Sequence, residues 1–218
     1  MINTNEIYNG DCILGMNKIE SESVDVIITD PPYGINFQSQ RRVQTEKLEK
    51  IVNDKRPFIW WLNEAYRVTK NNGCLACFCR WDVAEDFRKA IEWAGYQIKS
   101  QVVWDRLHHG LGDIKAQFAP RHDIIWFAVK GKYQFPNKRP VSVLSSMKVS
   151  GNKLVHPNEK PIELMEQLVV YLSKTDDIIL DPFAGSGSTL LAAKRTGRKY
   201  LGFEIDEKYY EIANGSLK

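Results

Sequence analysis

The chain has 218 residues, 43% of them hydrophobic, and a formal net charge of +3 at pH 7. This size and composition fit one domain, 1–218, with a sizeable core and exclude a disordered protein. No apolar run approaches the ~18 residues of a membrane span, and the N-terminal sequence MINTNEIYNGDC has no signal-peptide core. We therefore expect a cytoplasmic protein with no membrane partner.

Strand and helix patterns alternate along the whole chain. Val24–Thr29 is a β-branched run that two prolines stop, and Pro57 opens a helix that we expect to end at Gly73. We expect further strands at 6–9, 74–79, 96–104, 122–129, 176–181 and 199–206, and further helices at 82–94, 162–172, 190–195 and 207–217. This alternation predicts an α/β fold in which helices cover both faces of a mostly parallel sheet.

Two segments interrupt the alternation, and both are rich in basic residues. Residues 34–56 carry six Lys or Arg side chains against three acidic ones, and we interpret them as a mobile loop. Residues 131–158 read as an irregular insertion, and the range 130–160 has a net charge of +6, which leaves −3 for the rest of the chain. A local basic segment suits a polyanionic partner, although a solvated basic loop explains the charge equally well.

The four cysteines, Cys12, Cys74, Cys77 and Cys79, include a CxxC pair. A zinc site needs two further ligands at suitable spacing, and the sequence offers none. Because the surrounding residues follow the pattern of a buried strand, we expect reduced thiols in the core and no metal.

A glycine-rich turn follows the strand that ends at Asp181. Its sequence, DPFAGSGST, precedes a helix, where glycines let a ligand approach the backbone and free N–H groups attract anions. Glu204 ends the next strand, where an acidic side chain can accept the hydroxyl hydrogens of a ribose. The turn departs from the dinucleotide pattern because Leu190 stands at the third glycine position. We interpret it as a nucleoside-cofactor site other than that of NAD.

The tetrapeptide Asp30-Pro31-Pro32-Tyr33 also follows a buried strand. The two prolines stiffen the backbone and remove two donors, which leaves a carboxylate and carbonyl acceptors beside an aromatic ring. Such a corner suits a flat ring that carries an NH₂ group. A proline turn that merely stops the strand would account for the prolines but not for all four residues.

Together, DPPY and FAGSG resemble the amino-group DNA methyltransferases, in their adenine-N6 and cytosine-N4 branch. His156–Val169 (HPNEKPIELMEQLV) looks like motif X of that family, GFEID at 202–206 like motif II, and Gly10–Cys12 like motif III. The resemblance covers nearly the whole chain. The tetrapeptide precedes the cofactor half, which is similar to the circularly permuted motif order of the β group.

This resemblance implies a Rossmann-like S-adenosylmethionine-dependent methyltransferase fold with a seven-stranded sheet, and S-adenosyl-L-methionine as the cofactor. The implied catalytic residues are Asp30, Pro31, Pro32 and Tyr33. The cofactor-binding residues that we expect are Asp11, Cys12, Asp30, Lys160, Asp181, Phe183, Ala184, Gly185, Ser186, Gly187, Thr189, Glu204 and Ile205. In the family pattern Glu usually stands where this chain has Asp123, to which we assign a structural role.

The β group carries its target-recognition segment before motif X, and here that slot is the basic insertion 131–155. We expect double-stranded DNA as the partner, with the target base flipped out and loop 34–56 closing over it. A short recognition segment fits a short target, read with the help of a homodimer as in related enzymes. The DNA-binding residues that we expect are Arg41, Arg42, Lys132, Lys138, Arg139, Lys148 and Lys153.

The expected reaction is methylation of adenine N6, with Asp30 and the Pro31 carbonyl accepting the two amino hydrogens. Cytosine-N4 methylation stays open as the alternative, because the two activities share this chemistry; Asp at position 30 favours adenine, since cytosine-N4 members more often have Ser there. An inactive DNA-binding partner subunit is a second alternative, although such proteins tend to lose one of the two loops, and both are intact here.

Overall fold

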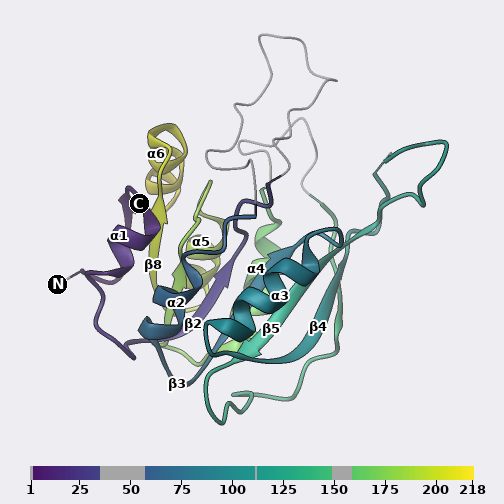
Figure 1. Cartoon of the computed structure of the whole chain (residues 1–218). Coiled ribbons are helices and arrows are strands. Elements are labelled where there is room, and N and C mark those ends of the chain that lie inside the picture. The colour runs from purple at the N-terminus through teal and green to yellow at the C-terminus, as the bar shows by residue number, and fades with distance from the viewer. Residues whose placement is uncertain (1, 35–56, 111, 149–158) are drawn as a thin grey trace.

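The computed structural model describes residues 2–34, 57–110, 112–148 and 159–218, which form one eight-stranded sheet flanked by helices (Figure 1). The strand order across the sheet is β1-β8-β7-β2-β3-β5-β4-β6. The strands are β1 (Glu6–Asn9), β2 (Val24–Thr29), β3 (Thr69–Cys79), β4 (Gln97–Asp105), β5 (His122–Val129), β6 (Val143–Ser145), β7 (Ile178–Asp181) and β8 (Lys199–Glu204). The helices are α1 (Cys12–Met16), α2 (Leu62–Val68), α3 (Ala84–Trp93), α4 (Ile162–Leu172), α5 (Ser188–Arg195) and α6 (Glu207–Ser216).

The predicted α/β fold with a mostly parallel sheet is confirmed. Among the described strands only β5 runs antiparallel to its neighbours, β3 and β4. The sheet has eight strands rather than the expected seven, because β6 forms within the predicted irregular insertion and pairs with the edge of β4. Three residues with one buried side chain, Leu144, are too short a run for periodicity to reveal.

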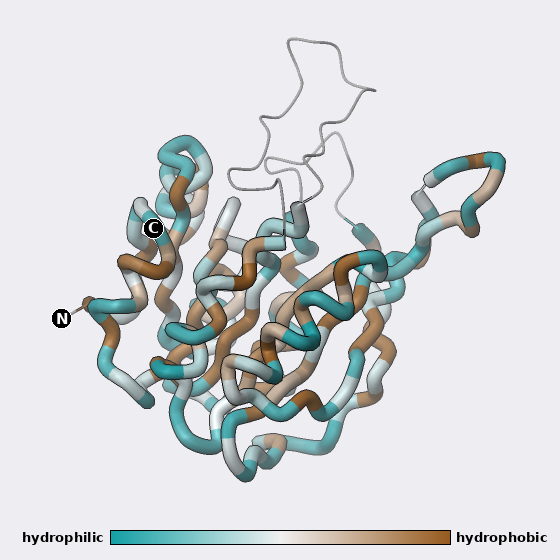
Figure 2. Tube along the Cα trace, viewed as in Figure 1, coloured by the Kyte–Doolittle hydropathy of each residue, from teal (hydrophilic) through white to brown (hydrophobic). Residues whose placement is uncertain are grey.

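Helices cover both faces of the sheet, as predicted. Figure 1 shows α2 and α3 in front of the sheet and α4 and α5 behind it, while in Figure 2 the hydrophobic colours gather in the central strands. The face behind packs against α4, α5 and α6 through side chains such as Leu164, Leu190 and Ala213. The face in front packs against α1, α2 and α3 through side chains such as Met16, Leu62 and Phe87.

The segment after Pro57 differs from its prediction at both ends. The helix begins at Leu62, and β3 already begins at Thr69, where a helix continuing to Gly73 was expected. The helix ends at Val68 because the Thr69 backbone is extended and pairs with Val24 of β2, while the Thr69 hydroxyl donates to the Ala65 carbonyl at 2.7 Å. Gly73 lies within β3, where a Cβ would lie 2.7 Å from the Asp25 carbonyl oxygen, so this glycine allows close approach of β3 to β2.

Strand order brings the two predicted loops to one edge of the sheet. β2, which leads into the tetrapeptide, pairs in parallel with β7, which leads into the glycine-rich turn. Parallel neighbours end at the same edge, where open α/β sheets bind their ligands. The loop between β4 and β5 projects from this same end of the molecule as a long arm (Figure 1).

Candidate active site

A buried hydrogen bond joins the two loops at their bases. The Thr29 hydroxyl, at the end of β2, donates to Asp181 Oδ1, at the end of β7, over 2.7 Å. The same carboxylate oxygen accepts the Phe183 backbone N–H at 3.0 Å. Both Thr29 and Asp181 are buried, and burial raises the pKa of the Asp181 carboxyl above its ordinary value. The contact therefore fixes the distance between tetrapeptide and turn.

The tetrapeptide is held on three sides. The Pro32 carbonyl accepts the Phe58 backbone N–H at 3.1 Å, which ties the corner to the chain before α2. The Tyr33 ring packs edge-on against Phe87, and its hydroxyl donates to Asp30 Oδ1. Lys160, just before α4, donates to the other carboxylate oxygen of Asp30. The catalytic carboxylate predicted from sequence is thus a fixed group with a donor on each oxygen.

Asp30 lies among groups that push its ionisation in opposite directions. Burial raises the pKa of its carboxyl to about 6, while the Lys160 ammonium lowers it and the carboxylates of Asp123 and Asp181 raise it. At pH 7 the group is therefore mostly ionised and acts as a hydrogen-bond acceptor. The Asp30 carboxylate takes up a proton a little below pH 7, at a much higher pH than the carboxylate of an exposed aspartate does.

The glycine-rich turn is organised around Glu204. Oε2 of this side chain accepts the Gly185 N–H at 2.7 Å, and Oε1 accepts the Asp206 N–H at 2.9 Å. Gly185 and Gly187 have φ of +53° and +85°. Because only glycine adopts such angles without strain, these two positions shape a concave turn beside the acidic side chain.

Replacement of Gly187 by Ala tests how much this shape matters. A Cβ there would meet the Ala213 Cβ at 3.0 Å in a left-handed backbone, so Gly187→Ala should destabilise the fold by about 1–2 kcal/mol and weaken cofactor binding. Thermal unfolding and a cofactor titration measure both effects. Gly215→Ala is the matched control, because its Cβ would meet nothing within 4 Å on helix α6, and it should leave both unchanged or slightly improved.

The N-terminal block lies against the backbone of the same acidic residue. The Gly10 N–H donates to the Glu204 carbonyl at 2.8 Å, and the Asp11 carboxylate caps α1 by accepting the N–H groups of Ile13 and Leu14. Asp11 and Glu204 are thus neighbours although 193 positions separate them in sequence. Ile205, which follows Glu204, is 44% exposed, while the half-buried Phe183 ring packs edge-on against Phe58 and Trp61 on the other side of the turn's start.

Several predicted cofactor-binding residues have buried side chains: Cys12, Asp181, Ala184 and Thr189. Burial raises the pKa of the Cys12 thiol to about 12, so it packs in the core as a neutral group. These residues shape the site from beneath, and a ligand would meet their backbone. Ser186, by contrast, is half-buried at the surface of the turn.

A pocket of about 430 Å³ opens beside the tetrapeptide. Its wall includes Tyr33 and Lys160, the aromatic side chains of Trp81 and Trp104, and the guanidinium groups of Arg80 and Arg106. Asp123 lies in the same wall and pairs with Arg106 at 3.5 Å. The pocket is large enough for a planar heterocycle with its sugar, and two of its lining residues, Tyr33 and Lys160, contact the Asp30 carboxylate.

Comparison with known proteins agrees with this geometry. A family model described as DNA methylase, of the N6/N4 type, matches residues 24–215. The methylase named YubD from Escherichia coli strain K12 is 33% identical over 212 residues, which span 95% of this chain and 88% of that one. The chain belongs to the N6/N4 DNA methylase family. The predicted resemblance is therefore confirmed.

Other members of this family match along most of the chain. Type II methyltransferase M.BglII of Bacillus subtilis is 29% identical, over 96% of this chain and 68% of its own length. The crystal structure of the M1.HpyAVI–SAM complex superposes with a TM-score of 0.75 at 25% identity and covers 96% of this chain and 98% of the other. PvuII DNA methyltransferase, described as cytosine-N4-specific, shares the fold at a TM-score of 0.75 but only 18% identity.

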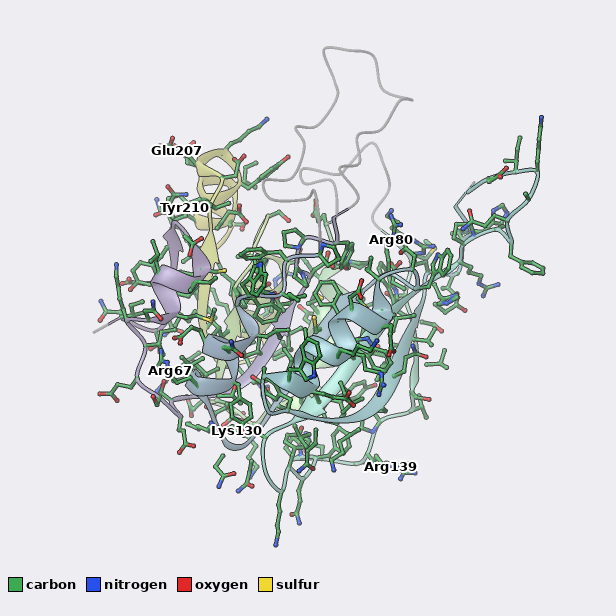
Figure 3. The ribbon with its side chains drawn as sticks, viewed as in Figure 1. Arg67, Arg80, Lys130, Arg139, Glu207 and Tyr210 are labelled. Atoms are coloured by element: carbon green, nitrogen blue, oxygen red, sulfur yellow. The ribbon has the colours of Figure 1, made fainter. Side chains whose placement is uncertain are left out.

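The DNA methylase does not bring all the predicted basic residues to this end of the molecule. Lys132 donates its backbone N–H to Asn72, at the amino end of β3, and Figure 3 shows Arg139, like Lys130, at the lower end of the molecule, away from Arg80 at the upper, catalytic end. Lys138 precedes Arg139 in the same segment. Lys148, in contrast, lines the pocket beside Tyr33. Arg41, Arg42 and Lys153, with loop 35–56 and segment 149–158, lie outside the described residues.

The four cysteines of the methylase are buried and unbridged, and three of them lie on β3. Among the described residues no group of three His, Cys, Asp or Glu side chains is placed to hold a metal ion. The helices described in the structure include none long and apolar enough to cross a lipid bilayer.

Two contacts of the site could not be foreseen from the sequence. Thr29 has no pattern that marks it as a link to Asp181, and no motif relates Lys160, which stays a predicted cofactor-binding residue, to Asp30. Both contacts join positions more than 100 residues apart. A local motif carries no information on such a partner, and the signal would have been the strand order itself.

Proposed function

We propose that the protein transfers a methyl group from S-adenosyl-L-methionine to N6 of adenine in DNA, and that it takes the target base out of the duplex. The observation that carries the proposal is the placement of an ionised, oriented carboxylate, Asp30, next to a cofactor-type turn through the Thr29–Asp181 contact. A binding module would not need a fixed acceptor at that point. Membership of the family indicates the class of reaction, and the contacts of the side chains indicate which residue has which role in it.

The residues around Glu204 fit S-adenosylmethionine. An adenosine has a ribose diol and a flat purine, and the site offers the Glu204 and Asp11 carboxylates with the exposed Ile205 side chain next to Glu204. The positive φ angles of Gly185 and Gly187 give the turn a backbone path that other residues adopt only with strain. When bound, this cofactor supplies a methyl group activated by a sulfonium charge, so the protein needs no metal to activate it.

The catalytic task of the tetrapeptide is to make a poor nucleophile react. The lone pair of an exocyclic amine is delocalised into the base, and two acceptors, the Asp30 carboxylate and the Pro31 carbonyl, would draw the nitrogen toward sp³ geometry. Both hydrogen bonds strengthen as positive charge builds on nitrogen, so they stabilise the transition state more than the ground state. The proton that the nitrogen loses on methylation passes to Asp30 and then to water.

The pocket beside Tyr33 would receive the flipped base. An amine inside a duplex cannot reach Asp30, and unstacking one base costs about a few kcal/mol. The exposed Trp81 ring offers aromatic surface for a base beside Tyr33, while Arg80, Arg106 and Lys148 offer positive charge for its phosphates. This wall favours a nucleic acid over an uncharged small molecule as the substrate.

Adenine is favoured over cytosine by the Asp at position 30, since cytosine-N4 enzymes more often have Ser there. The cytosine-N4 alternative keeps its place because PvuII DNA methyltransferase has the same fold. Digestion of methylated DNA and mass analysis of its nucleosides distinguishes the two. We expect N6-methyladenine; N4-methylcytosine in its place would contradict the adenine assignment.

An assay with labelled S-adenosylmethionine tests the alternative of an inactive partner subunit. We expect the purified chain alone to transfer a labelled methyl group from S-adenosylmethionine to duplex DNA. Binding of DNA without any transfer would favour the partner subunit. Heat-denatured enzyme serves as the control for uncatalysed labelling.

A further inference from the structure

Lys160 contacts the catalytic carboxylate directly. Its ammonium forms an ion pair with Asp30 Oδ2, and the two side chains are only 11% and 14% exposed. The Phe78 ring lies 5.0 Å from the same Nζ and shields one side of the pair. Oδ1 of Asp30 meanwhile accepts the Tyr33 hydroxyl, so the carboxylate has a charged donor on one oxygen and a neutral donor on the other.

Most side chains that face Asp30 from the neighbouring elements do not favour ionisation of its carboxyl. Asp181 on β7, Asp123 on β5 and the buried thiols of Cys77 and Cys79 on β3 offer it no positive charge. Lys148 lies within electrostatic range of Asp30 but is itself repelled by Lys160 and Arg106. Among the described residues, Lys160 is the cation in direct contact with this carboxylate.

We propose that Lys160 is a positioning residue for methyl transfer: its ammonium holds the Asp30 carboxylate ionised and oriented for the incoming amine. This inference rests on the proposed function of Asp30 as an acceptor. It goes beyond a contact with the cofactor, because it assigns Lys160 to the nucleobase side of the reaction. A buried carboxylate without a cation beside it would take up a proton and would then offer a donor to the amine where an acceptor is required.

The pH dependence of turnover follows from this arrangement. Burial holds the pKa of Asp30 near 6 even with Lys160 present, so kcat/KM of the wild type for DNA should fall as the pH drops through about 6. Loss of the Lys160 charge should move this acidic limb upward by about two pH units, since a neighbouring opposite charge lowers a carboxyl pKa by roughly 1–3. At pH 7 this means about tenfold lower kcat/KM for Lys160→Met, largely regained near pH 9.

The experiment measures kcat/KM for DNA against pH at saturating cofactor, together with cofactor affinity by direct titration of the free protein. Lys160→Arg keeps the charge and should keep its acidic limb close to that of the wild type. Lys89→Met is the matched control, since it removes an exposed lysine that pairs with Glu85 on helix α3, and its pH profile should not move. Should Lys160→Met fail to fold, Lys160→Gln loses the charge and keeps a donor for Asp30.

The outcomes separate this inference from its rival and from the proposed function. If Lys160 only binds cofactor, the loss appears in the affinity for S-adenosylmethionine, disappears at saturation, and leaves the acidic limb in place; that result overturns the inference. Infrared titration of the Asp30 carboxyl in wild type and variant, assigned with Asp30→Asn, gives a readout without turnover. An upward displacement of that titration in Lys160→Met supports the ion pair even if wild-type protein methylates no DNA, a result that would contradict only the proposed function.

Discussion

Asp30→Ala should lower the turnover number for DNA methylation by about 10²–10³-fold or more, the usual effect of removing a group that stabilises charge in a transition state. The substitution removes the acceptor that the amine needs and leaves the Lys160 ammonium and the Tyr33 hydroxyl directed at an empty corner. Cofactor affinity should stay within a few-fold, because Glu204 and the Gly185–Gly187 turn are not altered. Single-turnover transfer of labelled methyl and a cofactor titration measure the two quantities.

The control for this prediction is Asp25→Ala. Asp25 pairs with Lys70 at 2.7 Å and lies on the same strand, but far from the tetrapeptide. Both variants lose a carboxylate that pairs with a lysine, so both should be less stable, and melting temperatures show by how much. Only Asp30→Ala should lose turnover. Near-normal turnover of Asp30→Ala would mean that another group receives the amine.

Glu204→Ala should weaken cofactor binding by about 10- to 100-fold with little change in kcat at saturating cofactor. Its carboxylate accepts two backbone N–H groups, from Gly185 and Asp206, and would accept ribose hydroxyls as well. Charge-assisted hydrogen bonds contribute about 1.5–3 kcal/mol each, and 1.4 kcal/mol corresponds to a factor of ten. Titration of the protein with S-adenosylmethionine measures the affinity.

Glu204→Gln sharpens this prediction. One of the two side-chain positions becomes an NH₂ group that faces a backbone N–H, so glutamine cannot satisfy both Gly185 and Asp206, and its affinity should fall between those of the wild type and Glu204→Ala. Glu207→Ala, in the first turn of α6, is the matched control that removes an acidic residue from the adjoining helix. Equal affinities of the wild type and the three variants for S-adenosylmethionine would mean that Glu204 does not contribute to cofactor binding.

The sequence revealed the elements whose signal is local. The strand before Asp30 and the glycine-rich turn after Asp181 each combine a buried strand, a stop and a chemically unusual loop within about a dozen residues. Both loops lie where the pattern predicts, at the ends of β2 and β7. The resemblance to the DNA methylases supplied the permuted order that brings them together.

The rest depends on contacts between distant positions. The helix that was expected to reach Gly73 ends at Val68 because pairing of Thr69 with Val24 of β2 competes with helix propensity. Lys132 and Arg139 belong to a basic segment, but charge in sequence does not state which end of a sheet it will occupy, and the chain passes along the edge of β4 before Lys148 reaches the pocket.

The Lys160–Asp30 pair is the plainest example of such a contact. It joins positions 130 residues apart, on the segments before α4 and after β2, and neither sequence motif indicates a contact with the other. Motif comparison assigned Lys160 to the cofactor, whereas the structure places its ammonium on the carboxylate of the tetrapeptide. The chemistry of a site in this fold is therefore set by strand order as much as by motif content.

The most direct test is a crystal structure of the protein with duplex DNA and a cofactor analogue that cannot transfer methyl. We predict that an adenine leaves the duplex, enters the pocket beside Tyr33, and places its N6 within about 3.2 Å of both an Asp30 carboxylate oxygen and the Pro31 carbonyl. A base that remains stacked in the duplex, or an N6 that lies beyond reach of Asp30 while the analogue fills the Gly185–Gly187 turn, would contradict the account.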